Sequence, residues 1–407
     1  MEKQKCPELR FSQFKNDWNE TTLGDVVDII GGGTPDTNVP EFWNGDIDWY
    51  SPTEIGENVY ANGSIKKITV AGLKNSSAKI LPAKKTVLFS SRAGIGEMAI
   101  LNKPAATNQG FQSFIANNID VYFLYSMGAK IKKFALSKAS GSTFLEISRN
   151  QLAQMEFFAP SVELGEQTQI GHFFQNLDQS IALHEKKLAQ TQNLKKAMLE
   201  KMFPKAGSKQ PEIRLKGFSG DWEKKLLQDE VEFFSGLTYS PDDLTNKNGT
   251  LVLRSSNVQN NQICTDDNVY VVHDAVNVCN VEVGDIIVVV RNGSRSLIGK
   301  HAVINKQMKN TVIGAFMTGV KAKNPYFINA LFDTSLFDLA VSRNLGATIN
   351  QITTGMFKQM EFKFPDKTEQ IAIGQFFKKI DETLVLQQQQ LQTLKNLKQA
   401  FLEKMFV

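Results

Sequence analysis

One internal repeat limits what this chain of 407 residues can fold into. The segment PELRFSQFKNDW at residues 7–18 returns as PEIRLKGFSGDW at residues 211–222. Residues 166–203 align with residues 369–406 and are identical at 18 of 38 positions. The two displacements are 204 and 203 residues, so a whole half of the chain is duplicated. We therefore expect two copies of one arrangement.

The middle of each half diverges but keeps one pattern, an apolar strand, a turn containing Arg and Gly, and a second strand. Residues 84–101, KKTVLFSSRAGIGEMAIL, parallel residues 283–304, VGDIIVVVRNGSRSLIGKHAVI, with about four extra residues after Gly293. Short runs rich in β-branched residues and bounded by Gly predict strands. Each half is therefore predicted to begin with an α/β globule of about 160 residues.

A long helix is predicted after each globule. Residues 163–203 contain no proline, and apolar residues recur at close to heptad spacing in both copies. Five lysines balance five acidic residues in this stretch, so it is better suited to pair with a helix than with phosphate. The predicted pairing residues are Leu177, Ile181, Leu188 and Leu194 in the first copy and Ile380, Leu384, Leu391 and Leu394 in the second.

Because both halves contain this helix, we expect the two copies to pair within one chain as an antiparallel coiled coil with pseudo-two-fold symmetry. A coiled coil between two chains is the alternative. The predicted fold class is α/β (α+β), and the predicted segments are a globule at 1–160, a helix at 161–205, a globule at 206–365 and a helix at 366–407.

Motifs for catalysis and metal binding are missing from the sequence. Gly31–Pro35 (GGGTP) lacks the Lys-Ser/Thr of a phosphate loop and is better explained as a turn that ends a strand. Asn324–Phe327 (NPYF) faintly resembles an amino-methyltransferase loop, but no cofactor loop accompanies it, and Pro325 more simply starts a helix that includes Leu331 and Leu336. Three isolated cysteines, four scattered histidines and no membrane-length apolar run predict a cytoplasmic protein without a metal or cofactor.

Binding residues are predicted in the turns that follow strands, since loops on a rigid scaffold commonly carry recognition. Arg can bind guanine bidentately, and Asn or Gln can bind adenine in the same way. The net charge of +4 is too small to argue for nucleic acid, but four of the eight arginines fall in these loops. The candidates are Ser90, Ser91, Arg92, Asn108, Gln109, Arg254, Ser256, Asn257, Arg291, Asn292, Arg295 and Lys300, with Lys66 and Lys67 as phosphate contacts.

The doubled strings GSTFLEISRNQLAQMEFFAPSVELGEQTQIGHFFQNLDQSI, from Gly141, and GATINQITTGMFKQMEFKFPDKTEQIAIGQFFKKIDETL, from Gly346, carry a family resemblance. With GGGTPDTNVPEFWNGDIDW, SSRAGIGEMAI and NQGF in the first half, the chain resembles the specificity subunit of a type I restriction-modification system. In the second half GGGTP becomes SGLTY at residues 235–239. Contacts that the resemblance implies for the first half therefore transfer poorly to this segment.

That resemblance implies that each globule is a target recognition domain for one half of a bipartite, gapped site in double-stranded DNA. The helices are then a spacer that docks two methyltransferase subunits, which methylate adenine N6 with S-adenosylmethionine. Restriction subunits added to the complex would use ATP and Mg²⁺ to translocate and cut DNA. This chain would supply recognition without catalysis. The alternatives are a tandem scaffold for protein or RNA, which the small net charge favours, and a self-sufficient methyltransferase or nuclease.

Overall fold

The computed structural model describes residues 5–92, 94–141, 145–345 and 350–407. Residues 142–144 and 346–349, within the two repeated strings, lie outside the described residues. The chain forms two compact units, of which unit 1 comprises Met1–Glu185 with Gln389–Val407 and unit 2 comprises Lys186–Gln388. Each unit thus contains one globule and a half of each long helix. The division into four segments at 160, 205 and 365 stays a prediction.

Unit 1 combines a five-stranded sheet of order β2-β9-β6-β7-β4 with a three-stranded sheet of order β5-β3-β8 and the pair β1-β10. Its strands are β1 (Asn19–Thr22), β2 (Val27–Gly31), β3 (Trp43–Tyr50), β4 (Tyr60–Ala61), β5 (Lys66–Ile68), β6 (Thr86–Phe89), β7 (Met98–Leu101), β8 (Ala106–Thr107), β9 (Gln112–Ala116) and β10 (Glu156–Ala159). Its shorter helices are α1 (Leu23–Val26), α2 (Val70–Lys74), α3 (Val121–Ser126), α4 (Gly128–Lys138) and α5 (Arg149–Ala153).

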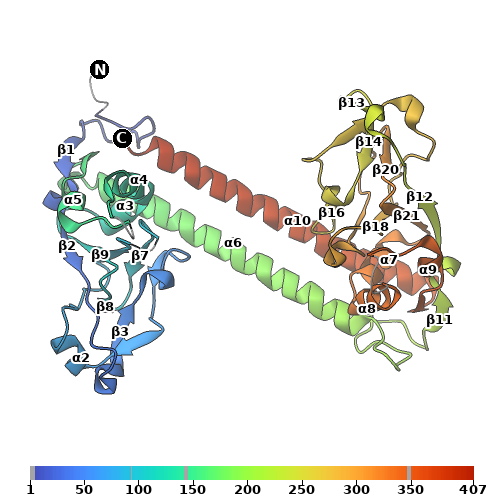
Figure 1. Cartoon of the computed structure of the whole chain (residues 1–407), viewed down its shortest axis with the longest axis horizontal. Coiled ribbons are helices and arrows are strands. Elements are labelled where there is room, and N and C mark those ends of the chain that lie inside the picture. Colours follow the sequence, from blue (N-terminus) through green and yellow to red (C-terminus); the bar gives the residue numbers. More distant parts are fainter. Residues whose placement is uncertain (1–4, 93, 142–144, 346–349) are drawn as a thin grey trace. The chain divides into compact units, whose positions relative to one another are not determined.

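The central strand β6 is buried on both faces, as its unbroken apolar run predicts. Val87 and Phe89 pack with the apolar residues of α3, α4 and α5. Leu88 points the other way and packs with Tyr50 of β3. Because successive side chains of a strand alternate in direction, β6 joins both layers of the core. Figure 1 shows β2, β9 and β7 of the same sheet beside α3, α4 and α5.

Unit 2 repeats this plan, with sheets of order β12-β21-β18-β19 and β13-β17-β14-β20 and the pairs β11-β22 and β15-β16. Its strands are β11 (Glu223–Leu226), β12 (Val231–Ser235), β13 (Leu244–Thr245), β14 (Thr250–Leu253), β15 (Val258–Gln259), β16 (Gln262–Ile263), β17 (Val269–Val271), β18 (Ile286–Val289), β19 (His301–Val303), β20 (Thr311–Ile313), β21 (Met317–Ala322) and β22 (Glu361–Phe364). Its shorter helices are α7 (Pro325–Phe332), α8 (Ser335–Asn344) and α9 (Thr354–Lys358).

The predicted strand–turn–strand units are confirmed as β6 with β7 and β18 with β19. One detail differs from the sequence prediction. Pro325 does start α7, but this helix ends at Phe332, and Leu336 lies on α8 instead. The reason is local, because Thr334 takes an extended conformation and its side chain accepts a hydrogen bond from the Phe337 N–H, which begins a new helix.

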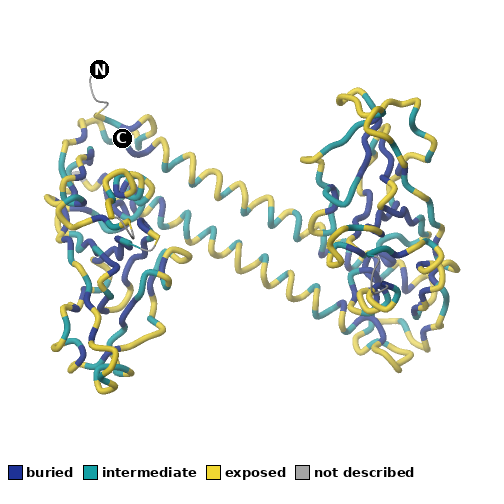
Figure 2. Tube along the Cα trace, in the orientation of Figure 1, coloured by how far each residue is buried: buried dark blue, intermediate teal, exposed yellow. Residues whose placement is uncertain are grey.

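The two long helices are α6 (Glu166–Met202) and α10 (Lys367–Lys404), and they pair antiparallel within each unit, as predicted. In unit 1 the ring centroids of Phe173 and Phe401 lie 4.9 Å apart, near the start of α6 and the end of α10. In unit 2 Lys195, near the end of α6, forms an ion pair of 2.6 Å with Asp381, near the start of α10. Figure 2 shows that exposed and half-buried stretches alternate along both helices, whereas buried segments gather in the globules.

The repeated PELR and PEIR motifs join both helices in each unit. Arg10 binds Glu166, the first residue of α6, through two hydrogen bonds of 2.6 Å, while the Leu9 N–H donates to the Lys404 carbonyl of α10 (3.0 Å). In unit 2 Arg214 binds Glu369 of α10 in the same bidentate way. The first part of the repeat, residues 7–18 and 211–222, therefore connects each globule to the long helices. In each unit it contacts the start of one long helix and the end of the other.

Candidate nucleic-acid interface

Backbone hydrogen bonds join the loops that follow the central strands of unit 1. Ser91, after β6, donates its N–H to the Gly110 carbonyl (2.8 Å). Asn108 donates its N–H to the carbonyl of Tyr50 at the end of β3 (3.0 Å). The structure thus brings the predicted residues 90–92 and 108–109 together with the turn after β3.

The two predicted serines of this cluster lie inside the protein. Ser90 and Ser91 are fully buried. The Ser90 hydroxyl donates to the Gly94 carbonyl (2.5 Å) and accepts from the Glu97 N–H (2.9 Å). Their burial corrects the prediction of direct contacts with DNA, because neither side chain presents a surface to a ligand, and the Ser90 hydroxyl instead holds the turn in shape.

The NQGF loop lies against the glycine-rich turn after β2. The Asn108 side-chain oxygen accepts from the Gly110 N–H (2.8 Å), and the exposed Gln109 accepts a hydrogen bond from Thr34. A Cβ atom on Gly32 would lie 1.9 Å from the Asn108 carbonyl oxygen. The GGGTP segment ends β2 at Gly31 and continues as a loop, and it has no side chain at Gly32 because the NQGF backbone approaches it closely.

The two predicted phosphate contacts begin β5. The Lys66 ammonium lies 5.8 Å from the centroid of a Trp43 ring. Lys67 forms an ion pair of 3.5 Å with Asp48 and remains 47% exposed. Since an exposed ion pair contributes little, an incoming phosphate can compete for either ammonium group.

The turn after β14 in unit 2 contains three predicted residues. Asn257 is fully buried, and its side chain accepts from the Arg254 N–H (2.9 Å) and donates to the Cys264 carbonyl (2.9 Å). Its burial corrects the prediction that it contacts DNA, and it instead holds the turn in shape. The half-buried Arg254 pairs with Asp267 at 2.8 Å, and Ser256 is half-buried.

The remaining predicted residues of unit 2 follow β18. Asn292 donates from its side-chain amide to the Ser255 hydroxyl (3.0 Å), which joins this loop to the turn after β14. Arg295 donates to the Leu345 carbonyl (3.3 Å). Arg291 and Lys300 are exposed. Unit 2 therefore gathers its polar loop residues beside the same strand ends as unit 1. The loop cluster of each unit consists of residues 90–92 with 108–110 in unit 1 and residues 254–257 with 291–295 in unit 2.

Arg92 and Arg291 occupy equivalent backbone positions in the two units. Each follows the central strand of its unit, which is β6 in unit 1 and β18 in unit 2, and forms an isolated antiparallel bridge, Arg92 with Glu146 and Arg291 with Gln351. The Arg92 guanidinium lies 3.9 Å from the Glu146 carboxylate, whereas that of Arg291 lies 5.0 Å from the centroid of the Phe316 ring. Sequence reasoning missed the partners Glu146, Gln351 and Phe316, although aligning RAG with RNG would have matched the two arginines.

The predicted pairing residues of the long helices follow a partly buried seam, with one exception. Ile380 is 9% exposed. Six other predicted residues are half-buried, namely Leu177, Ile181, Leu188, Leu384, Leu391 and Leu394. Leu194 is 49% exposed, which corrects the prediction that it pairs. Positions seven residues apart lie on one helix face, so the seam passes from Leu188 to Lys195 rather than to Leu194.

Each unit has a lysine–aspartate pair between the long helices. Lys398 lies 2.5 Å from Asp178 in unit 1, and Lys195 lies 2.6 Å from Asp381 in unit 2. Both members are displaced by 203 residues, so the pair belongs to the repeat. In unit 1 the Tyr122 hydroxyl also donates to Asp178 (2.7 Å). Burial and the neighbouring carboxylate raise the pKa of Tyr122, which keeps the phenol protonated and able to donate.

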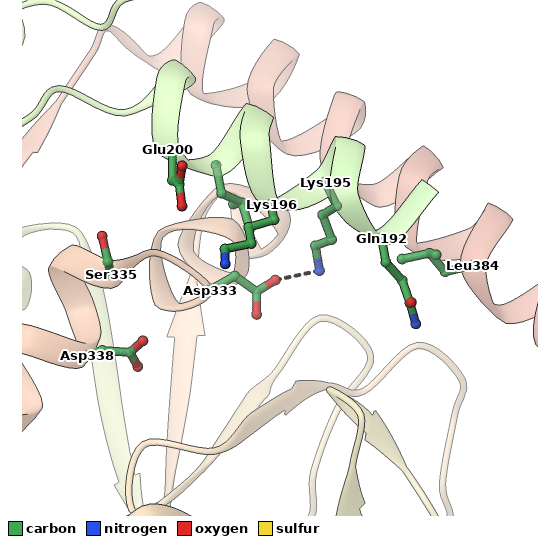
Figure 3. Close-up of a pocket in the computed structure, with 9 residues that line it drawn as sticks. Gln192, Lys195, Lys196, Glu200, Asp333, Ser335, Asp338 and Leu384 are labelled. Carbon is green, nitrogen blue, oxygen red and sulfur yellow. Dashed lines mark hydrogen bonds and ion pairs between the residues drawn. The ribbon is translucent and has the colours of Figure 1, made fainter. Parts of the chain in front are cut away.

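In unit 2 the corresponding lysine borders a cavity of about 400 Å³ (Figure 3). Lys195 projects from α6 toward Asp333, which follows α7, at 2.6 Å, and His301 lies 3.2 Å from the same carboxylate. Although burial alone raises the pKa of Asp333, its contacts with His301 and Lys195 hold that pKa below its usual value. The lining residues are Gln192, Lys195, Lys196, Leu199, Glu200, Asp333, Ser335, Asp338 and Leu384, so the cavity is separate from the loop cluster.

Within the described ranges, no group of three or more His, Cys, Asp or Glu side chains is placed to hold a metal ion. No helix in the same ranges is long and apolar enough to cross a membrane. What the loops offer chemically is a set of guanidinium, amide and ammonium groups held at strand ends, which suits hydrogen bonding to anions and base edges.

A family model described as the type I restriction modification DNA specificity domain matches residues 15–193 and 219–396. The specificity subunit of type I restriction enzyme MjaIX from Methanocaldococcus jannaschii is 33% identical over 198 residues, covering 47% of this chain and 44% of that relative. The specificity subunit of EcoR124I/EcoR124II from Escherichia coli is 30% identical over 179 residues, covering 42% of this chain and 43% of that relative. Both matches thus span less than half of the relative's length.

A solved structure of similar fold covers nearly the whole chain. The crystal structure of the type I restriction-modification S subunit from M. genitalium has a TM-score of 0.66 at 16% identity and covers 99% of each chain. A second solved structure concerns complex assembly and conformational transition of the type I R-M system. It has a TM-score of 0.54 at 16% identity and covers 95% of this chain and 97% of that chain. At this identity the likeness concerns the fold.

Proposed function

The chain belongs to the type I restriction modification DNA specificity domain family, and from this premise we propose that it selects the DNA sequence for a type I restriction-modification complex. Each unit binds one half of a bipartite, gapped site in double-stranded DNA. The chain itself catalyses no reaction. The observation that carries the proposal is the equivalent placement of Arg92 and Arg291 at the loop cluster of each unit.

The backbone geometry of the two units supports one base-reading arginine in each. A guanidinium that extends from a strand end, on a loop tied by backbone hydrogen bonds to two others, has a defined starting position. Arg can donate two hydrogen bonds to guanine in the major groove, and each such pair contributes about 1–3 kcal/mol of discrimination. Lys66 and Lys67 supply phosphate contacts, which position the duplex without reading its sequence.

The test is to map methylated adenines in cells that express this chain with its methyltransferase subunits. Arg92→Ala should relax one half-site and Arg291→Ala the other, each by about 5- to 150-fold at one base position. Arg149→Ala and Arg343→Ala are matched controls, because both arginines are exposed and lie outside the loop clusters. Equal weakening on all sequences by both test variants would assign these arginines to phosphate and contradict the proposal.

The proposal includes docking of two methyltransferase subunits on the long helices. Four exposed leucines support it, because they form two pairs displaced by 203 residues, namely Leu183 (50% exposed) with Leu386 (54%) and Leu194 (49%) with Leu397 (44%). Unit 1 contains Leu183 and Leu397, and unit 2 contains their equivalents Leu386 and Leu194. Each unit therefore offers the same exposed apolar residues, which fits two copies of one partner. Exposed leucines of this kind add apolar area to an interface.

Native mass spectrometry of the purified complex tests this docking. Leu183→Asp with Leu397→Asp in unit 1, or Leu386→Asp with Leu194→Asp in unit 2, should each remove one methyltransferase subunit. Ala182→Asp, at an exposed neighbouring position, should retain both subunits. Two bound subunits in both double variants would contradict docking on the helices.

In this proposal the partner subunits, and not this chain, carry out the chemical reactions. Methyltransferase subunits bind S-adenosylmethionine and methylate adenine N6, and restriction subunits, where they join, use ATP and Mg²⁺. The chain works in the cytoplasm, where the DNA lies. A direct check is calorimetry of the isolated chain with S-adenosylmethionine, which should detect no binding. Binding by this chain alone would contradict the division of roles.

A further inference from the structure

Phe316 is an exposed aromatic residue at the loop cluster of unit 2. It lies between β20 and β21, and 54% of its surface is accessible. Its carbonyl accepts hydrogen bonds from the Val290 N–H (3.0 Å) and the Arg291 N–H (3.2 Å), so its backbone is held against the end of the central strand. The ring faces the Arg291 guanidinium, whose carbon lies 5.0 Å from the ring centroid.

The equivalent position in unit 1 has no side chain. Gly110 accepts the corresponding hydrogen bond from Ser91, and a Cβ atom there would lie 2.8 Å from Cγ of Pro52. Unit 1 therefore has no room for a ring beside Arg92, which is paired with the Glu146 carboxylate instead. The ring is a feature of unit 2, as expected for a residue that depends on the sequence read by that unit.

An exposed aromatic ring next to an exposed arginine can serve two purposes at once. Stacking on the ring restricts the rotamers of Arg291, so less conformational entropy is lost when the guanidinium binds a base. The free face of the ring is apolar, and the only apolar group on a base edge in the major groove is the C5-methyl of thymine. Because the two side chains are in contact, they would reach neighbouring base pairs.

We propose that Phe316 is a specificity-determining residue of unit 2, which orients Arg291 on a guanine and contacts the methyl group of a thymine beside it. The inference rests on the proposed function, since it requires that unit 2 reads DNA. The half-site of unit 2 contains a thymine next to a guanine.

Replacement of that thymine by uracil, which removes only the methyl group, tests the contact. The complex should bind the uracil duplex about fourfold more weakly, the ratio expected for losing one buried methyl group. Phe316→Ala should weaken binding to thymine DNA and bind the two duplexes equally. Phe316→Tyr retains the ring and should keep the preference. An exposed ring contributes little to folding, so the melting temperature of each variant should stay unchanged.

A second substitution tests the orientation of the arginine. Replacing the guanine by 7-deazaguanine removes the N7 acceptor and should weaken binding by the wild-type complex but not by Arg291→Ala. A bipartite site without thymine beside guanine, or equal wild-type binding to thymine and uracil duplexes, overturns this inference alone. Absence of any sequence-dependent methylation overturns the proposed function together with it.

Discussion

Lys195→Met removes the cation that two carboxylates share in unit 2. The Lys195 ammonium lies 2.6 Å from both Asp333 and Asp381, and its side chain is 13% exposed. Breaking a buried ion pair by removing one partner costs about 3–5 kcal/mol, because a buried charge is left without compensation. Asp381 is 33% exposed and can be hydrated, whereas Asp333 is 7% exposed and keeps only its contacts with His301 and Asn261. We therefore expect the lower end, about 3 kcal/mol.

Thermal unfolding followed by calorimetry measures this loss. For a unit of this size about 3 kcal/mol corresponds to a decrease of roughly 6–12 °C in Tm. Lys395→Met is the matched control, because Lys395 pairs with Glu185 at 2.7 Å between the same two helices but both side chains are about half exposed. An exposed pair contributes about 0–1 kcal/mol. A similar decrease in Tm for both variants would refute the argument from burial.

The pH dependence of the difference follows from the direction of each pKa shift. Asp333 has a lowered pKa, so its contribution is complete above its unfolded value of about 4 and is lost as the pH falls through the folded value. Burial lowers the pKa of Lys195, but the two carboxylates raise it further, so its contribution is lost only in strong alkali. Burial raises the pKa of Asp381 although Lys195 lowers it, so Asp381 is protonated at a higher pH than Asp333. The stability difference between wild type and Lys195→Met should be largest at neutral to alkaline pH and shrink as the pH falls and the two carboxylates are protonated. A difference that disappears at pH 7 would contradict these assignments.

Two further predictions concern stability. Arg10→Ala and Arg214→Ala should each cost about 3–5 kcal/mol in chemical denaturation, because each removes the bidentate partner of a fully buried glutamate; unequal losses would show that the two contacts are not equivalent. Gly32→Ala should destabilise unit 1 by more than about 2 kcal/mol in thermal unfolding, because its Cβ would overlap the NQGF backbone, whereas Gly63→Ala, with nothing within 4 Å, should stay within about 0.5 kcal/mol. Equal Tm values for the two alanine variants would contradict this packing.

The long helices and the repeated globule were predictable because their signals are local or duplicated. Heptad spacing over about forty residues and a displacement of 203 residues can both be recognised although many surface residues differ between the two copies. Leu194 shows the limit of the periodic signal. Leu194 lies one residue before the seam position, which Lys195 occupies. One residue turns a helical side chain by about 100°, and this turn places Leu194 on the exposed face.

The candidate site was only partly predictable, because burial depends on contacts between distant segments. Ser90 and Asn257 look like exposed turn residues in the sequence, yet each completes hydrogen bonds inside its own turn. Phe316 is the opposite case, since an aromatic residue between two apolar strands reads as core. It is exposed because its backbone, rather than its ring, holds the end of the central strand.

The lysine–aspartate pairs show how one helix design accommodates two different globules. In unit 1 the globule supplies a donor, and the Tyr122 hydroxyl binds the carboxylate of Asp178. In unit 2 the globule supplies an acceptor, and Asp333 binds the ammonium group of Lys195. A paired lysine still has N–H groups to donate, and a paired carboxylate still has lone pairs to accept. The repeated pair can therefore satisfy a buried polar group of either kind, which allows the globules to diverge while the helices that hold them stay the same.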